Sequence, residues 1–301
     1  MKVFYGTTNN SIDVTNICHA KLLTHDNVIH IQSGDVNRAR YFSDPIPDLL
    51  KSIIILNNGI STEYDAFTQI KINVTNNTVS TTHDTELNNK LSKIHATLHM
   101  NYGSLNDELA EQKMAVRYLT GNEKVLELGG NIGRNSLVIA SILQDSANLV
   151  TLECDVGIAN QLTENKNSNQ LNFHIESSAL SARKLIQKEW NTKPSDTLED
   201  GYTWVNTITY DDLKTKYNNI KFDTLVLDCE GAFYYILMDT PEILTNINLI
   251  IMENDYLDKS HKTYIDDILK NHQFNTIFTE GGGWGPCANN FYEVWAKTGH
   301  S

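Results

Sequence analysis

The stretch Val125–Ser136, Val-Leu-Glu-Leu-Gly-Gly-Asn-Ile-Gly-Arg-Asn-Ser, constrains the fold more than any other part of the chain. A short apolar run is followed by glycines and then by the apolar segment 137–140, which predicts a buried parallel strand, a tight turn and the start of a helix. Gly129 and Gly133 lack a Cβ, so they allow turn geometry and the close approach of a ligand to the backbone. The free N–H groups of the helix start suit a carboxylate or a phosphate. The alternative is an ordinary strand–helix turn, in which glycine is common.

The glycine spacing separates this turn from the dinucleotide fingerprint G-x-G-x-x-G. Gly129 is followed by Gly130, Asn131 and Ile132 before Gly133, so the third position lacks its glycine. From Glu127 the stretch instead has the pattern E-x-G-x-N-x-G. This pattern resembles motif I of class I S-adenosylmethionine (SAM) methyltransferases, in the Asn-containing form of the FkbM family, where the turn holds the methionine part of SAM. The resemblance implies SAM contacts from Glu127, Gly129, Gly130, Asn131, Gly133, Arg134 and Asn135.

Length and charge limit the classes of function. With 301 residues, the chain can bury a full α/β core and has room for one more small domain. Its formal net charge of −13 argues against a nucleic-acid backbone or an anionic membrane as partner. No run of about eighteen apolar residues occurs, and the N-terminus lacks the apolar core of a signal peptide. We therefore expect a soluble, cytoplasmic protein.

The cysteines are widely spaced and form no C-x-x-C pair. This spacing argues against both a zinc site and a disulfide framework. Cys154 and Cys229 fall at the ends of predicted strands, and we expect them to be small buried apolar residues.

Residues 1–80 contain short β-type runs separated by turn clusters, which predicts a small β-rich domain, either a sandwich or an open barrel. The runs are Lys2–Tyr5, Ser11–Val14, Val28–Gln32, Ser52–Leu56 and Thr68–Val74. No residues with catalytic spacing occur there. The domain is either an acceptor-docking or glycan-contacting module or a packing or dimerisation appendage. The polar segment Asn76–Thr85 is expected to be a linker to a second domain at residues 86–301.

Two helical patterns, Leu87–Leu98 and Asn106–Leu119, begin the second domain. The second pattern leads directly into the first core strand, so that helix should lie against the ligand cleft. Glu108, Glu111 and Gln112 are three or four residues apart and largely share one face. They form either a solvated face or a wall of the cleft, and the solvated face is the favoured interpretation.

From Lys124 onward, predicted strands alternate with helices, which indicates a mostly parallel sheet. After the strand at 125–128 we expect strands at Leu149–Cys154, Phe173–Ser177, Thr224–Asp228 and Leu249–Glu253, and then the pair Thr276–Thr279 and Phe291–Ala296 with no helix between them. A terminal antiparallel hairpin departs from the dinucleotide fold. We therefore expect a Rossmann-like class I methyltransferase fold, with a seven-stranded, mostly parallel sheet and an antiparallel C-terminal hairpin.

Ligands of open α/β sheets bind outside the carboxyl ends of the strands, so polar residues at those ends are the candidate site. Glu153 ends the second predicted strand, where an acid can accept hydrogen bonds from both ribose hydroxyls. The alternative for Glu153 is an exposed acid at a strand end. Ser177, Ser178 and Ala179 end the third strand, where similar enzymes contact the edge of the adenine.

A second motif lies in Phe222–Leu237, an apolar strand that ends in Asp228-Cys229-Glu230-Gly231 and turns at once into a helix. It is similar to the D-x-E-G-a-E motif of FkbM methyltransferases, with Phe233 in place of the last acidic residue. The resemblance covers about residues 119–297 and implies O-methylation of sugars or other hydroxylated small molecules. Large DNA viruses encode similar proteins beside glycan-building enzymes, and a viral source would place the protein in the host cytoplasm.

A sugar hydroxyl gains from a base, which contributes about 10²–10⁴-fold. Asp228 is the first candidate base, followed by Glu230 and Glu253 and then by His261, although acids just before a helix can also serve as caps. Asp228 with Glu253 and Asn254 also resembles the set of oxygen ligands that holds Mg²⁺ in metal-dependent O-methyltransferases.

We therefore expect a methyltransferase that uses SAM, with Mg²⁺ as an open alternative, and that acts on a hydroxyl of a sugar or glycan. N- or carboxyl-methylation with the same cofactor, and a non-catalytic glycan-binding or scaffold protein, are the competing hypotheses. Monomer and homo-oligomer both stay open.

Overall fold

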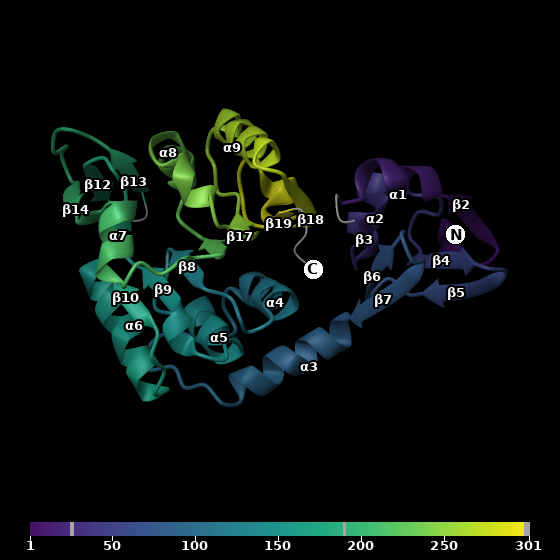
Figure 1. Ribbon diagram of the computed structural model, residues 1–301, viewed down its shortest axis with the longest axis horizontal. Coiled ribbons are helices and arrows are strands. Elements are labelled where there is room, and N and C mark those ends of the chain that lie inside the picture. Colours follow the sequence, from purple (N-terminus) through teal and green to yellow (C-terminus); the bar gives the residue numbers. More distant parts are fainter. Residues whose placement is uncertain (25–26, 189–190, 298–301) are drawn as a thin grey trace. The chain divides into compact units, whose positions relative to one another are not determined.

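The computed structural model describes residues 1–24, 27–188 and 191–297 (Figure 1). These residues form two compact units. The first contains residues 1–90 and 277–279, and the second contains residues 91–276 and 280–297. The last four residues of the second predicted domain, 298–301, lie outside the described part of the chain.

The first unit contains two antiparallel sheets, in the strand orders β2-β1-β4-β5 and β3-β6-β7. Their apolar residues alternate with polar ones, as in β6, where buried Ile70 and Ile72 flank exposed Lys71. The strands are β1 (Lys2–Thr7), β2 (Asn10–Asp13), β3 (Val28–Ile31), β4 (Ser52–Asn57), β5 (Ile60–Tyr64), β6 (Thr68–Asn73) and β7 (Thr78–His83), and the helices are α1 (Thr15–Lys21) and α2 (Asp35–Phe42).

Strand β7 occupies most of the segment 76–85 that the sequence assigned to a linker, so that prediction is wrong. The strand pairs antiparallel with β6 from Thr68↔His83 to Asn73↔Thr78. Val79 packs against the core of the first unit. The β-branched residues of the segment outweigh its polar composition, because they fit a half-buried sheet surface. Helix α3 (Asp84–His95) begins at the next residue.

The second unit is built on a seven-stranded sheet in the order β10-β9-β8-β16-β17-β19-β18. The strands from β10 to β17 are parallel to their neighbours, and β19 is antiparallel to β17. This arrangement confirms the predicted class I methyltransferase fold, in which the last strand in sequence is inserted antiparallel before the sheet edge. The strands are β8 (Val125–Leu128), β9 (Leu149–Leu152), β10 (His174–Glu176), β16 (Thr224–Leu227), β17 (Leu249–Glu253), β18 (Phe274–Glu280) and β19 (Tyr292–Lys297).

The central strands β8, β9 and β16 are buried along their whole length, because helices cover both faces of the sheet. Helix α4 packs against α5, and α8 packs against α9, on opposite sides of the strands in Figure 1. The helices are α4 (Leu109–Tyr118), α5 (Arg134–Ile142), α6 (Val156–Ser168), α7 (Tyr210–Lys216), α8 (Phe233–Asp239) and α9 (Lys259–Asn271), with short 3₁₀ turns η1 (Ser146–Asn148), η2 (Pro241–Leu244) and η3 (Ala288–Asn290).

An additional small sheet lies between β10 and α7, where the sequence predicted no element. Its central strand β12 (Leu185–Lys188) pairs antiparallel with β13 (Asn191–Pro194) and with β14 (Thr203–Val205). The strands β11 (Ala179–Leu180) and β15 (Thr207–Ile208) form a short parallel pair where the chain enters and leaves this insertion.

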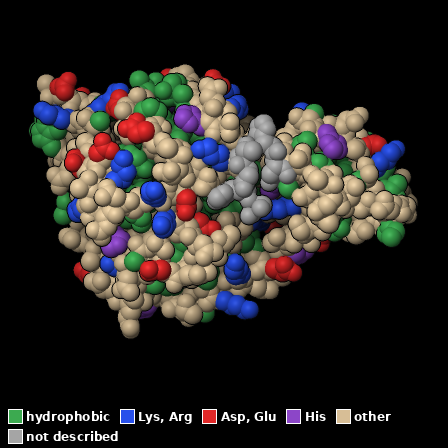
Figure 2. All heavy atoms as spheres, viewed as in Figure 1, with side chains coloured by type: hydrophobic (Ala, Val, Ile, Leu, Met, Phe, Trp, Pro, Cys, Tyr) green, Lys and Arg blue, Asp and Glu red, His purple; other side chains and the backbone are tan. Residues whose placement is uncertain are grey.

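Two surface properties complete the description. Within the three described ranges, no helix has the length and apolar character that crossing a bilayer requires. On the face drawn in Figure 2, acidic and basic side chains are interspersed, so the negative net charge is not gathered in one patch there.

Candidate functional site

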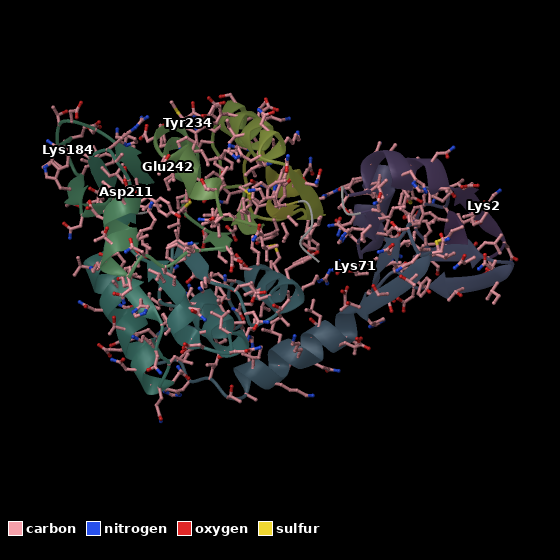
Figure 3. All side chains as sticks on the ribbon, in the orientation of Figure 1. Lys2, Lys71, Lys184, Asp211, Tyr234 and Glu242 are labelled. Atoms are coloured by element: carbon pink, nitrogen blue, oxygen red, sulfur yellow. The ribbon has the colours of Figure 1, made fainter. Side chains whose placement is uncertain are left out.

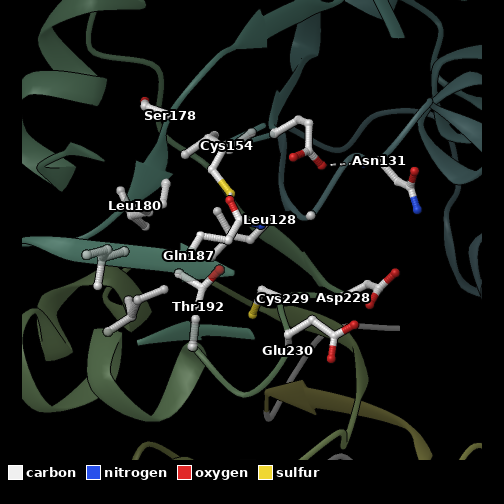
Figure 4. Close-up of a pocket in the computed structure, with 17 residues that line it drawn as sticks. Leu128, Asn131, Cys154, Ser178, Leu180, Gln187, Thr192, Asp228, Cys229 and Glu230 are labelled. Carbon is white, nitrogen blue, oxygen red and sulfur yellow. Dashed lines mark hydrogen bonds between the residues drawn. The ribbon is translucent and has the colours of Figure 1, made fainter. Parts of the chain in front are cut away.

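A pocket lies at the carboxyl ends of β8, β9 and β16, where the strand-end rule predicted a ligand (Figure 4). The start of α8 and the inserted strands β12 and β13 complete its lining. Seven of the residues that the sequence singled out line this pocket: Gly129, Asn131, Glu153, Ser178, Ala179, Asp228 and Glu230. The others lie outside its lining: Glu127, Gly130, Gly133, Arg134, Asn135, Ser177, Glu253, Asn254 and His261.

The glycines of the turn after β8 are required by packing within the protein. Gly129 has φ +90°, and a Cβ there would lie 1.6 Å from the carbonyl oxygen of Asp228. Gly133 has φ +95°, and a Cβ there would lie 2.3 Å from a methyl group of Leu162 on α6. The sequence attributed these glycines to the close approach of a ligand. The structure shows instead that the turn touches the end of β16 and α6 at these two positions.

Glu127 lies beneath this turn and is buried. The hydroxyl of Ser136 on α5 donates a hydrogen bond to its Oε2 at 2.5 Å. Burial raises the pKa of Glu127 to about 7. Gly130 is held against β9, because a Cβ there would meet the hydroxyl of Thr151 at 2.3 Å. Glu127 therefore ties the strand to the helix that follows the turn.

Glu153 holds the turn from the opposite side and also lines the pocket. Its Oε2 accepts a hydrogen bond from the backbone N–H of Asn131 at 2.9 Å, and its Oε1 accepts one from the N–H of Asp155 at 2.8 Å. Asn131 has φ 45°, a conformation that asparagine tolerates better than most residues. Burial raises the pKa of Glu153, while the two N–H donors lower it. The carboxylate is thus fixed in orientation and still has lone pairs for a ligand.

Arg134 and Asn135 begin α5, directly after the turn. The Nη1 atom of Arg134 donates to Glu108 Oε1 at 2.6 Å, and its Nε lies 3.5 Å from Asp107 Oδ2. The side-chain oxygen of Asn135 is buried without a hydrogen-bond partner among the described atoms. Arg134 therefore connects the turn after β8 to the residues that precede α4.

A cluster of carboxyl groups borders the pocket beyond Asp228. Burial raises the pKa of Asp228 well above its usual range, and the neighbouring carboxyl groups, Asp255 first, raise it further. Burial and a hydrogen bond with Glu111 likewise raise the pKa of Glu253. Asp255 accepts a hydrogen bond from the N–H of Gly231 at 2.9 Å, and burial raises its pKa to about 7. Burial and the repulsion between neighbouring carboxylates therefore both favour the protonated forms of these acids.

Helix α4 contributes to this cluster, contrary to the favoured prediction that its polar face is solvated. Glu111 is 7% exposed and Gln112 is fully buried. The amide of Gln112 donates to the carbonyl oxygens of Leu105 and Asp107. Because α4 packs against α5, β17 and β19, polar residues on more than one side of the helix are covered. The burial therefore contradicts a solvated face, although no residue of α4 is among the described residues that line the pocket.

The residues predicted to hold Mg²⁺ follow or end the neighbouring strands β16 and β17. Asn254 is fully buried, and its amide donates to the carbonyl oxygen of Asn290 at 2.6 Å, while its side-chain oxygen has no hydrogen-bond partner among the described atoms. Glu253 forms a hydrogen bond with Glu111, and burial raises its pKa, whereas an oxygen ligand of a hard cation must be free of protons. Throughout the described residues, no group of three or more His, Cys, Asp or Glu side chains is placed to hold a metal ion.

His261 lies on α9 and stacks on the ring of Tyr234, with ring centroids 3.7 Å apart and an interplanar angle of 5°. Tyr234 belongs to α8 (Figure 3). The ring of Tyr235 meets His261 edge to face. His261 thus packs two helices together, and the structure does not bring it into the pocket with Asp228.

The inserted sheet contributes pocket residues that the sequence analysis missed. Leu185 and Gln187 on β12 and Thr192 on β13 line the pocket. The thiol of Cys154 donates a hydrogen bond to Gln187 Oε1 at 3.7 Å. The sequence signal for this sheet is the run Thr203-Trp204-Val205, in which two β-branched residues flank an aromatic residue and favour a strand.

The charge of the pocket is one-sided. Three acids, Glu153, Asp228 and Glu230, line it, and among the described lining residues there is no Lys, Arg or His. The rest of the lining combines neutral polar side chains with apolar ones, the latter including Leu128, Leu152, Leu180, Leu185 and Ile236. Such a lining disfavours a cofactor that carries phosphates and favours a flat apolar group joined to a positive charge.

Comparisons with known proteins find only distant structural likenesses. No protein-family model and no curated protein matches the sequence. Among solved structures, the chain is similar to an O-methyltransferase from Bacillus cereus in complex with SAH, at 15% identity over 70% of this chain and 91% of that one, with a TM-score of 0.42. It is also similar to the O-methyltransferase TomG from Streptomyces achromogenes, involved in tomaymycin synthesis and in complex with SAM, at 13% identity over 69% and 89% of the two chains, with a TM-score of 0.40. A ribosomal protein L11 methylase from Lactobacillus delbrueckii subsp. bulgaricus has 12% identity over 65% and 80%, with a TM-score of 0.39. These are distant likenesses, and the description of the fold rests on the strand order given above.

Proposed function

We propose that this protein is a SAM-dependent methyltransferase that transfers a methyl group to a hydroxyl of a sugar or another hydroxylated acceptor, as its resemblance to the FkbM family implies. The observation that carries the proposal is the convergence of the turn at Gly129, of Glu153 and of Asp228 on one pocket at the strand ends. The sequence predicted all three as strand-end residues of one site, and all three line this pocket.

The chemistry of the lining fits SAM. Glu153 offers carboxylate oxygens for the ribose hydroxyls, and the leucine-rich wall suits a purine. Asp228 and Glu230 place negative charge where the sulfonium and the ammonium of the methionine part need it. When bound, SAM supplies an electrophilic methyl group on a positively charged sulfur.

Asp228 is the proposed base, because it lines the pocket and belongs to a buried group of acids. A positive charge bound in the pocket lowers the pKa of Asp228 and favours its carboxylate. The Asp228 carboxylate would accept the proton of the acceptor hydroxyl as that oxygen takes up the methyl group, and the sulfur of the cofactor would keep the electron pair of the broken bond. The raised pKa of this carboxyl group makes it a better proton acceptor than an exposed aspartate.

The acidic lining also bears on the kind of acceptor. A carboxylate acceptor would be repelled by Asp228 and Glu230, so carboxyl-methylation fits the pocket poorly. A neutral hydroxyl can donate its proton to either acid without that repulsion. This argument supports a hydroxylated acceptor over an acidic one.

Calorimetric titration with SAM, followed by incubation with methyl-labelled SAM and a panel of sugars, tests the proposal. We expect saturable SAM binding and label transfer to at least one hydroxylated compound. An absence of SAM binding at high micromolar protein would favour the scaffold hypothesis instead. Label transfer to amines or carboxylates alone would retain the cofactor and reject the proposed acceptor.

A further inference from the structure

One side of the inserted sheet faces the pocket. Leu185 and Gln187 are two residues apart on β12 and therefore share a face, while Ile186 between them points the other way and is fully buried. Thr192 on β13 is the cross-strand partner of Gln187 and so lies on the same face. All three residues of this face line the pocket. The insertion thus supplies one polar amide and one hydroxyl beside an apolar side chain.

Gln187 is held firmly and lies beside the expected ribose acid. It sits on the central strand of the insertion, paired with Thr192 on one side and with Thr203 on the other. Its Oε1 accepts the hydrogen bond from the Cys154 thiol, and Cys154 directly follows Glu153. Figure 4 shows Gln187 and Cys154 next to each other in the pocket. Gln187 and Glu153 therefore line neighbouring parts of the same pocket.

The strand end that the sequence assigned to the adenine offers little to recognise its edge. Ser178 is 4% exposed, and its hydroxyl donates to Glu176 Oε1 at 3.1 Å. Ala179 has no polar side-chain atom. Asn131 carries the other side-chain amide of the lining, and it lies in the turn after β8, away from Gln187 and Cys154 in Figure 4. Gln187 is therefore the side-chain amide placed to recognise a base.

We propose that the face formed by Leu185, Gln187 and Thr192 binds the purine of the cofactor, and that Gln187 makes the site select adenine over hypoxanthine. The proposal rests on the proposed function, since it assigns a base-binding role within the same cofactor pocket. A glutamine amide presents a donor and an acceptor side by side, the pattern that pairs with the amino group and N7 of adenine. Hypoxanthine carries an oxygen in place of that amino group, so the amide oxygen would face another acceptor.

Adenine selection by Gln187 is tested by measuring the affinity of the full-length protein for two ligands that lack the sulfonium charge. S-adenosylhomocysteine and S-inosylhomocysteine differ only in the base. We expect the wild type to bind the adenine compound about 5- to 150-fold more tightly, the range for a bidentate pair of an amide with adenine. Gln187→Leu and Gln187→Met remove the amide, and either should bring the ratio of the two affinities to within about twofold. Gln161→Leu makes the same change on α6, outside the pocket lining, and should keep the wild-type ratio.

The outcomes separate this inference from the function on which it rests. Equal affinities in the wild type would overturn adenine selection while leaving the methyltransferase proposal intact. A wild-type ratio that survives in folded Gln187→Leu and Gln187→Met would overturn the role of Gln187. Binding of neither compound, together with no binding of SAM, would overturn the proposed function and this inference with it.

Discussion

The variant Gly129→Ala should lose about 1.5–3.5 kcal/mol of unfolding free energy, because the turn after β8 has no room for a methyl group. A left-handed backbone at φ +90° costs an alanine about 1–2 kcal/mol. The new Cβ would also lie 1.6 Å from the Asp228 carbonyl oxygen, so the end of β16 would have to move away by more than an ångström. That movement breaks the hydrogen bond from the Asp228 N–H to the Leu128 carbonyl, at about 0.5–1.5 kcal/mol.

Urea unfolding of Gly129→Ala measures this loss, which is a large share of the usual stability of about 5–15 kcal/mol. Gly157→Ala is the matched control. Gly157 lies in α6 with no left-handed backbone, and the nearest atom to its added Cβ is 3.2 Å away. The control should be neutral or slightly stabilising, because alanine favours helices. A loss below about 0.5 kcal/mol in Gly129→Ala would refute the packing argument and restore the simpler view that this glycine serves only a ligand.

Three further perturbations address the site. Glu153→Ala should weaken SAM binding by about 1.5–3 kcal/mol in calorimetry, as expected for hydrogen bonds to a charged group, and a change of a few tenths would mean that another acid holds the ribose. Asp228→Asn should lower turnover at least about a hundredfold and weaken SAM binding by much less, because Glu230 keeps a negative charge in the pocket; near-normal turnover would move the base to Glu230, and recovery by Mg²⁺ after EDTA treatment of the wild type would make Asp228 a metal ligand. Burial raises the pKa of Glu127 to about 7, so the protonated Glu127 carboxyl group contributes fully to the unfolding free energy below about pH 4.5. This contribution is lost as the pH rises through 7. In Glu127→Gln, the unfolding free energy measured in urea should fall by about 3 kcal/mol less across this pH range than in the wild type. An unchanged dependence of that free energy on pH would contradict the burial argument. Glu242→Gln, at an exposed position on η2 (Figure 3), is the matched control for Glu127→Gln.

Local patterns were enough to predict the sheet and the position of its ligand site. The four-residue apolar runs of β8 and β16 indicate strands buried on both faces, and each is followed at once by a turn and a helix. Once the strands are parallel, their carboxyl ends share one edge of the sheet. The pocket positions of Glu153 and Asp228 follow from that rule and require no knowledge of side-chain packing.

Only the tertiary structure decided which side chains meet. Glu111 and Glu253 come from α4 and β17, far apart in the sequence, and their hydrogen bond depends on how that helix packs on the sheet. A helical pattern gives the spacing of polar residues along a face but does not say what covers the face.

The same limit applies to the glycine turn and to the insertion. A glycine signals a backbone that lacks room for a Cβ, and only the fold shows that the neighbour at Gly129 is the Asp228 backbone. Gln187 sits on a strand of four residues, too short for its alternation to stand out in the sequence. The sequence by itself determined the framework of the seven-stranded sheet, because strand and turn preferences are local. Tertiary packing determined the chemistry of the pocket wall, because that wall is assembled from segments that are distant along the chain.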